Sequence, residues 1–203
     1  MAKRTAAAMA LALLAGLCGF APAAVAGLPY ATVHYDPGGG TASIIQPVYI
    51  PSHIVGGAAP DGSDPFRNPS DLFIAGDDHV YVADRGNHRV VELDERGRLV
   101  RVYGTDGEGK LRAPEGVFVA ENGDVYVADT GNKRIAVFDR EGNFLRQYGR
   151  PESDLLPADY NFVPVKLVVD GRGVMYAASQ SAYQGLVRIA PDGGFAGFYG
   201  ANR

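Results

Sequence analysis

Residues 114–149 read PEGVFVAENGDVYVADTGNKRIAVFDREGNFLRQYG, and residues 68–104 read NPSDLFIAGDDHVYVADRGNHRVVELDERGRLVRVYG. The chain therefore contains nearly the same sequence twice, and a shift of 45 residues aligns Asp84 with Asp129. A looser third copy occupies residues 164–200. A fixed period of about 20 to 50 residues indicates a repeat architecture. We interpret each copy as one structural unit.

Each unit consists of short apolar stretches separated by turn residues. The stretches are rich in Val, Ile, Phe and Tyr, as strands are. Gly beside Asn or Asp lies between them, as in tight hairpin turns. In the second copy the predicted strands are Val117–Val119, Val125–Ala128, Ile135–Phe138 and Phe144–Tyr148. Four strands every 40 to 50 residues predict an all-β fold built from the blades of a β-propeller.

The two clean copies resemble the NHL repeat. In the second copy the resemblance is carried by Val125–Asp129, Gly131-Asn132 and Arg134, and the first copy has the same residue types 45 positions earlier. In the third copy Ser179 stands where the Asp belongs. The resemblance implies an NHL-type propeller, and such propellers usually have six blades. We therefore expect three four-stranded blades (68–104, 114–149 and 164–200) of an expected six, completed by further chain or by oligomerisation.

The first 26 residues are predicted to be a signal peptide. Lys3 and Arg4 supply a charged start, residues 6–20 an apolar core, and Ala24-Val25-Ala26 a cleavage pattern of small residues. Cleavage near Ala26 predicts a secreted or periplasmic protein. A membrane anchor is the competing interpretation, but the apolar run is short for a transmembrane helix. We expect no transmembrane segment in the mature chain.

Residues 27–67 are predicted to be an extended leader rich in Pro, Gly and Tyr. The simpler interpretation is a lead-in that pairs with or packs against the first blade. The alternative is an aromatic binding surface formed by Tyr30, His34, Tyr35 and Tyr49, because tyrosine brings contact area at low entropic cost. The blades then fill residues 68–203.

The composition limits the classes of partner. Without residues 1–26 the chain has 17 Lys and Arg against 23 Asp and Glu, a net charge of −6, and it loses its one cysteine. Nucleic-acid binding needs a positive surface, so no nucleic-acid partner is expected. Without cysteine, stability must come from the core and from the hydrogen bonds of the sheets.

The order of strands predicts which loops share one end of the blades. The loops between second and third strands should lie with the linkers that join the blades, and we call this end the rim. It comprises residues 84–89, 129–134 and 179–184 with the linkers 105–113 and 150–163. Loops on a rigid scaffold commonly carry function, so the rim is the predicted binding end.

The rim sequence DRGNHR and its echo DTGNKR can be interpreted in two ways. Read structurally, Asp and Asn cap the turn, Gly takes a positive φ, and Arg ties the turn to the neighbouring blade. Recurrence favours this interpretation for Asp84, Asn87, Arg89, Asp129, Asn132 and Arg134. The positions that vary within the frame are predicted to contact a partner, and they are Arg85, His88, Thr130, Lys133, Gln180 and Tyr183.

No residue is predicted to be catalytic or to bind metal. The four histidines form no paired metal spacing, His79 is predicted to be exposed, and neither a nucleophile elbow nor a phosphate loop is present. Tyr103, Tyr148 and Tyr199 are predicted to pack between neighbouring sheets.

The predicted function is an exported, non-catalytic binding or scaffolding module for a protein, peptide or glycan, with self-association as a way to close the ring. No cofactor is expected for such a module. The resemblance also implies an alternative, a metal-dependent lyase or gluconolactonase-like hydrolase with Ca or Zn in the central channel of a complete propeller.

Overall fold

A computed structural model describes residues 32–35, 42–45, 65–180 and 185–200. The chain divides into two compact units, Met1–Ile54 and Val55–Arg203. The predicted signal peptide, most of the leader and Tyr183 lie outside the described residues. In the described part, no helix has the length and apolar character needed to cross a membrane.

The first unit contains one antiparallel hairpin within the predicted leader. Its strands are β1 (Thr32–Tyr35) and β2 (Ala42–Ile45), which pair with Thr32 opposite Ile45. They form a two-stranded sheet of their own.

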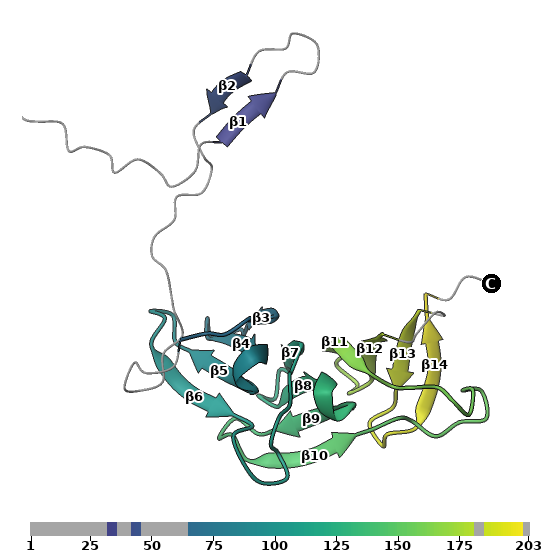
Figure 1. The fold of residues 1–203 in the computed structure, drawn as a ribbon. Helices are drawn as coiled ribbons and strands as arrows, with labels where there is room; N and C mark the ends of the chain where they lie inside the picture. Colours follow the sequence, from purple (N-terminus) through teal and green to yellow (C-terminus); the bar gives the residue numbers. More distant parts are fainter. Residues whose placement is uncertain (1–31, 36–41, 46–64, 181–184, 201–203) are drawn as a thin grey trace, which may run out of the picture. The chain divides into compact units, whose positions relative to one another are not determined.

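The second unit consists of three sheets of four strands each, which confirms the predicted blades (Figure 1). Blade 1 comprises β3 (Asp71–Ile74), β4 (Val80–Asp84), β5 (Arg89–Leu93) and β6 (Leu99–Tyr103). Blade 2 comprises β7 (Gly116–Val119), β8 (Val125–Asp129), β9 (Arg134–Phe138) and β10 (Phe144–Tyr148). Blade 3 comprises β11 (Pro164–Val169), β12 (Met175–Ser179), β13 (Leu186–Ile189) and β14 (Phe195–Tyr199). Two short 3-10 turns follow the second strands, η1 (Arg85–Asn87) and η2 (Thr130–Asn132).

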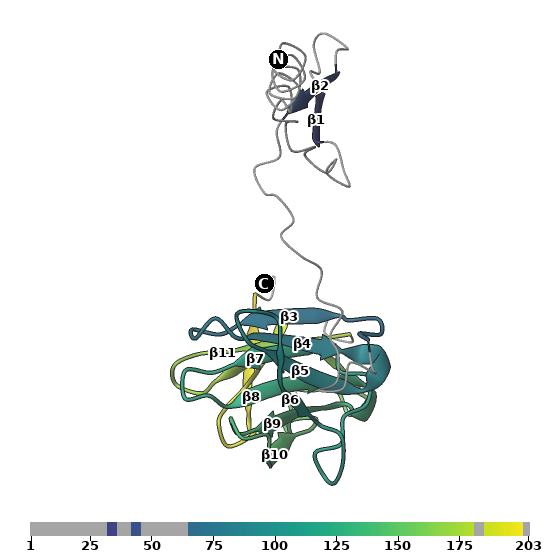
Figure 2. The same cartoon turned by 90° about the vertical axis from the view of Figure 1, so that its left-hand side faces the viewer.

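Every sheet is an antiparallel meander in which each strand pairs with the next one in sequence. The first strands β3, β7 and β11 lie closest to one another, and the last strands lie farther apart (Figures 1 and 2). This is the arrangement of propeller blades around an axis, so the fold is a partial β-propeller.

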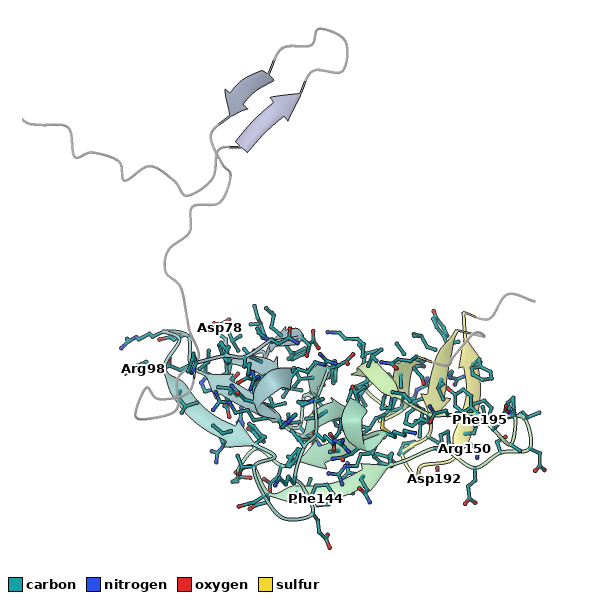
Figure 3. All side chains as sticks on the ribbon, in the orientation of Figure 1. Asp78, Arg98, Phe144, Arg150, Asp192 and Phe195 are labelled. Carbon is teal, nitrogen blue, oxygen red and sulfur yellow. The ribbon has the colours of Figure 1, made fainter. Side chains whose placement is uncertain are left out.

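The hydrophobic core lies in two layers between the blades. Alternate residues of a strand point to opposite faces, so blade 2 contributes one set of side chains to each layer. Val127 and Phe138 pack toward blade 1, whereas Tyr126 and Ile135 pack toward blade 3. Side chains fill the spaces between the three sheets (Figure 3). Blade 2 is therefore covered on both faces.

The last-strand tyrosines confirm the prediction where a next blade is present. Tyr103 is fully buried, with its ring 5.9 Å from that of Phe138 in blade 2. The hydroxyl of Tyr148 donates to the carbonyl oxygen of Pro191 in blade 3 at 2.9 Å. Tyr199, at the end of blade 3, is instead 61% exposed.

Candidate functional site

The rim of blade 1 is organised by a buried carboxylate. Asp84 has no exposed surface, and its Oδ1 accepts a hydrogen bond from the backbone N–H of Arg67 at 2.8 Å. Its Oδ2 accepts from Asn87 Nδ2 and from Arg89 Nε, both at 2.8 Å. A buried charge is tolerated when it is paired and hydrogen-bonded, so this cluster fixes the loop.

The rim of blade 2 repeats the same cluster. Asp129 is fully buried and accepts from the N–H of Arg112 at 2.7 Å, from Asn132 at 2.8 Å and from Arg134 Nε at 2.7 Å. In blade 3, Ser179 Oγ accepts from the N–H of Val163 at 3.0 Å. The serine therefore retains the bond to the preceding linker.

Two details of the predicted rim differ from the structure. The positive φ belongs to His88 (58°) and Lys133 (56°), not to the glycines of the loop. Gly86 and Gly131 are needed for space, because a Cβ there would lie 2.4 Å from Arg67 O and 2.5 Å from Arg112 O.

The arginine that ends each rim loop, Arg89 or Arg134, also makes other contacts than those predicted. Arg134 binds Asp129 in its own blade and donates to the carbonyl oxygens of Glu108 and Lys110 in the linker that leads into that blade. Arg89 forms the equivalent ion pair with Asp84.

Two of the residues predicted to contact a partner, Arg85 and Thr130, bond to the start of the next blade. Arg85 Nε lies 3.1 Å from Glu115 Oε1, just before β7. Thr130 is buried, and its hydroxyl donates to Pro164 O at 2.7 Å, at the start of β11. In blade 3 the equivalent Gln180 is exposed.

The second pair of variable rim positions behaves in the same way. His88 Nδ1 accepts from the N–H of Ala113 at 3.0 Å, and Lys133 Nζ donates to Asn161 Oδ1 at 3.0 Å. Both side chains contact the linker that enters the next blade. Their equivalent in blade 3, Tyr183, lies outside the described residues.

His79 is not simply exposed, as predicted, but is paired with a buried carboxylate. Its Nδ1 lies 2.7 Å from Glu92 Oε1, and the two side chains are 28% and 5% exposed. The hydrogen bond to Glu92 raises the pKa of His79, and partial burial opposes this effect. Tyr103 donates to the other oxygen of Glu92 at 2.8 Å. Burial, followed by the charge of Glu92, raises the pKa of Tyr81 to about 12.

A pocket of about 790 Å³ lies at the opposite end of the blades from the rim. We call it the turn pocket, because the turns between first and second strands of all three blades line it. Its apolar wall includes Phe73 and Phe118, whose ring centroids are 5.0 Å apart. The full lining is Phe73, Ala75, Gly76, Asp77, Tyr81, Phe118, Val119, Ala120, Glu121, Asn122, Gly123, Tyr126, Arg140, Val169, Asp170, Gly171 and Gly173.

Charged groups lie along the edge of the turn pocket. Asp77 of blade 1 accepts from Arg140 Nη2 of blade 2 at 2.7 Å. Asp170 of blade 3 accepts from the backbone N–H groups of Arg172 and Val174. Partial desolvation tends to raise the pKa of Asp170, but these hydrogen bonds outweigh it and lower the pKa. An aromatic wall with a charged edge can hold a ligand that has both apolar and polar faces.

The turn pocket was not predicted from the sequence, although one signal pointed to it. Gly76, Glu121 and Gly171 occupy the same position in three successive turns, and this position accepts both glycine and a long side chain. Positions that hold a scaffold together vary less freely. Within the residues that the structure describes, no group of three or more His, Cys, Asp or Glu side chains could hold a metal ion.

Comparison with sequence families gives the repeats their name. The NHL repeat model matches residues 66–93 and 111–138, and each match includes the lead-in residue, Arg67 or Arg112, that bonds to Asp84 or Asp129. This chain contains NHL repeats. The matches fall on blades 1 and 2. No curated protein matches the sequence significantly.

Solved structures confirm the propeller fold of the NHL-repeat chain. A streptogramin B lyase is 13% identical with a TM-score of 0.51, and the match covers 80% of this chain and 45% of that one. Virginiamycin B lyase from Staphylococcus aureus is 16% identical with a TM-score of 0.52, covering 82% and 54%. Hydrazine synthase from Kuenenia stuttgartiensis is 13% identical with a TM-score of 0.51, covering 77% and 40%. The chain thus spans about half the length of these proteins, and at this identity the likeness concerns the fold.

Proposed function

We propose that this chain is an exported, non-catalytic binding module that holds a protein, peptide or glycan ligand in the turn pocket. The observation that carries the proposal is the pocket itself, which combines an aromatic wall with carboxylate and guanidinium groups. Pockets of several hundred Å³ with a few polar groups are typical ligand sites.

The contrast with the rim supports this choice of site. At the rim, the side chains of Arg85, His88, Thr130 and Lys133 bond to neighbouring parts of the protein. In the turn pocket, the rings of Phe73 and Phe118 contact one another between two blades and line a cavity. Rigid sheets support both rings, so a ligand would meet a preorganised surface.

The experiment has two steps. The purified protein is first screened against arrays of oligosaccharides and of short peptides. Affinity for a captured ligand is then measured for Gly76→Trp, which adds a large side chain at the pocket edge, where a Cβ meets no atom within 4 Å. We expect a loss of about tenfold or more, equivalent to about 1.4 kcal/mol.

The matched control is Gly149→Trp, since a Cβ at Gly149 also meets no atom within 4 Å and this residue follows β10 at the rim end. Unchanged affinity for the control supports the turn pocket. If only the control lost affinity, the binding site would lie at the rim instead of the turn pocket. Metal analysis of the same protein distinguishes the binding module from the enzyme alternative, because stoichiometric calcium or zinc would favour a metal-assisted lyase or hydrolase.

A further inference from the structure

The two interfaces between blades use the same set of contacts. The hydroxyl oxygen of Tyr103 in blade 1, which donates its proton to Glu92, lies 3.3 Å from Arg140 O, in the turn between the third and fourth strands of blade 2. Tyr148 of blade 2 donates to Pro191 O at 2.9 Å, in the equivalent turn of blade 3. Figure 3 labels Asp192, the next residue of that turn. In both interfaces, the tyrosine at the end of one blade's last strand thus reaches the turn between the third and fourth strands of the next blade.

A glycine receives the tyrosine in both interfaces. A Cβ at Gly142 would lie 3.9 Å from Tyr103 Cδ1, and one at Gly193 would lie 3.4 Å from Tyr148 Cδ1. Both glycines have positive φ, 93° and 91°. Gly97 holds the same position in blade 1 and also has positive φ, 73°. Blade 1 thus has the receiving half of the contact.

Blade 3 has the donating half of the same contact. The ring of Tyr199 lies 5.6 Å from that of Tyr176, as Tyr103 lies 6.1 Å from Tyr81 in blade 1. Tyr199 is therefore held on its own blade as Tyr103 is, yet it is 61% exposed where Tyr103 is fully buried.

Among the residues that the structure describes, further groups on the outer flank of blade 3 have no neighbouring blade. Gln180 is exposed at the position from which Arg85 and Thr130 bond to the next blade. Arg188 Nε is buried and finds no hydrogen-bond acceptor among the described residues. Val168 on the same flank is 47% exposed.

The opposite flank of the unit is also open. Leu72 and Ile74 of blade 1 are each 60% exposed, whereas Val117 and Val119, which occupy the same positions in blade 2, are 1% and 9% exposed. Exposed apolar surface of this kind marks an interaction site. Among the described residues, blade 3 therefore carries the donating tyrosine without a following blade. Blade 1 carries the receiving glycine and exposed apolar residues without a preceding blade.

We propose that the flank of blade 3 binds blade 1 of a second copy of this chain, so that two copies join head to tail. Tyr199 of one copy then packs on Gly97 and donates to the carbonyl oxygen of Glu95 in the other, and Leu72 and Ile74 become buried. The contact continues the two interfaces already present within the chain. A head-to-tail contact closes into a ring when the rotation between copies allows it.

Light scattering on the purified exported chain tests the proposal. We expect the mass of two chains for the unmodified protein. Tyr199→Asp and Leu72→Asp each alter an exposed residue and should each yield the mass of one folded chain. The matched control is Leu145→Asp, which alters a 44% exposed residue on β10 of blade 2 and should retain the two-chain mass.

Mixing the two disruptive variants tests the direction of the contact. A pair made of one Tyr199→Asp chain and one Leu72→Asp chain has one interface with both flanks unmodified, so two-chain particles should return at higher concentration. A single-chain mass for the unmodified protein would overturn the proposal. Sensitivity to Tyr199→Asp without sensitivity to Leu72→Asp would overturn the head-to-tail arrangement, and a series of larger species would overturn the closed pair.

Discussion

At the rim, Asp84 and Asp129 are completely buried and each carboxylate accepts three hydrogen bonds. At the turn pocket, the side chain of Asp77 is 38% exposed and its ion-pair partner Arg140 is 62% exposed. Charged residues of the same kinds therefore serve the scaffold at one end and line a cavity at the other. Exposed, loosely constrained groups near a cavity are available to a ligand, whereas buried, fully bonded groups are not.

The largest expected effect comes from removing a rim carboxylate. Asp129→Ala leaves Arg134 without its buried partner, and breaking a buried ion pair costs about 3–5 kcal/mol. Asp77→Ala at the pocket removes an exposed pair, which is worth about 1 kcal/mol or less. Urea denaturation of both variants gives the two free energies of unfolding. Equal losses would show that the two ends do not differ.

Glycine substitutions sharpen the same comparison. Gly131→Ala places a Cβ 2.5 Å from Arg112 O, so backbone must shift, and overpacking of this kind costs about 1–3 kcal/mol. Gly76→Ala adds a Cβ in open space, so its free energy of unfolding should change by about 0.5 kcal/mol or less. Thermal unfolding measures both. A stable Gly131→Ala protein would contradict the close approach of the loop and the linker.

The pairing of His79 with Glu92 predicts a smaller, pH-dependent effect. Because the pKa of His79 is raised in the folded state, its stabilisation is fully present below the unfolded value of about 6.5. The stabilisation is lost as the pH rises through the folded pKa. The unmodified protein should therefore exceed His79→Gln in stability by about 1 kcal/mol or less at pH 5.5, and the difference should shrink by pH 8.5.

Denaturation curves at the two pH values measure this difference. His88→Gln, at the rim, is the matched control. A difference for His79→Gln that grows with rising pH would reverse the sign and contradict the pairing.

The fold was predictable because its pattern is local and repeated. The stretch predicted as a strand at Val125–Ala128 is the strand Val125–Asp129 in the structure, and its copy at Val80–Asp84 forms the same strand in blade 1. The third blade was also predictable in spite of Ser179, since its strands keep the spacing of apolar and turn residues.

The functional site was less predictable, because contacts between blades join residues far apart in sequence. Thr130 varies between the copies and so suggested a partner, but its hydroxyl bonds to Pro164, 34 residues away. The turn pocket likewise collects Gly76, Glu121 and Gly171 from three turns. His79 was predicted to be exposed because it lies next to the turn between the first and second strands. Its pairing with Glu92 depends on side-chain geometry, which the sequence pattern does not give.

Amide chemical-shift mapping tests the division between the two ends most directly. The labelled protein is titrated with pools of oligosaccharides and of short peptides, and the glycine amides serve as reporters. We predict shifts at Gly76 and Gly171 of the turn pocket, with Gly86 and Gly131 of the rim unchanged. Shifts confined to Gly86 and Gly131, or no shifts with either pool, would contradict the account.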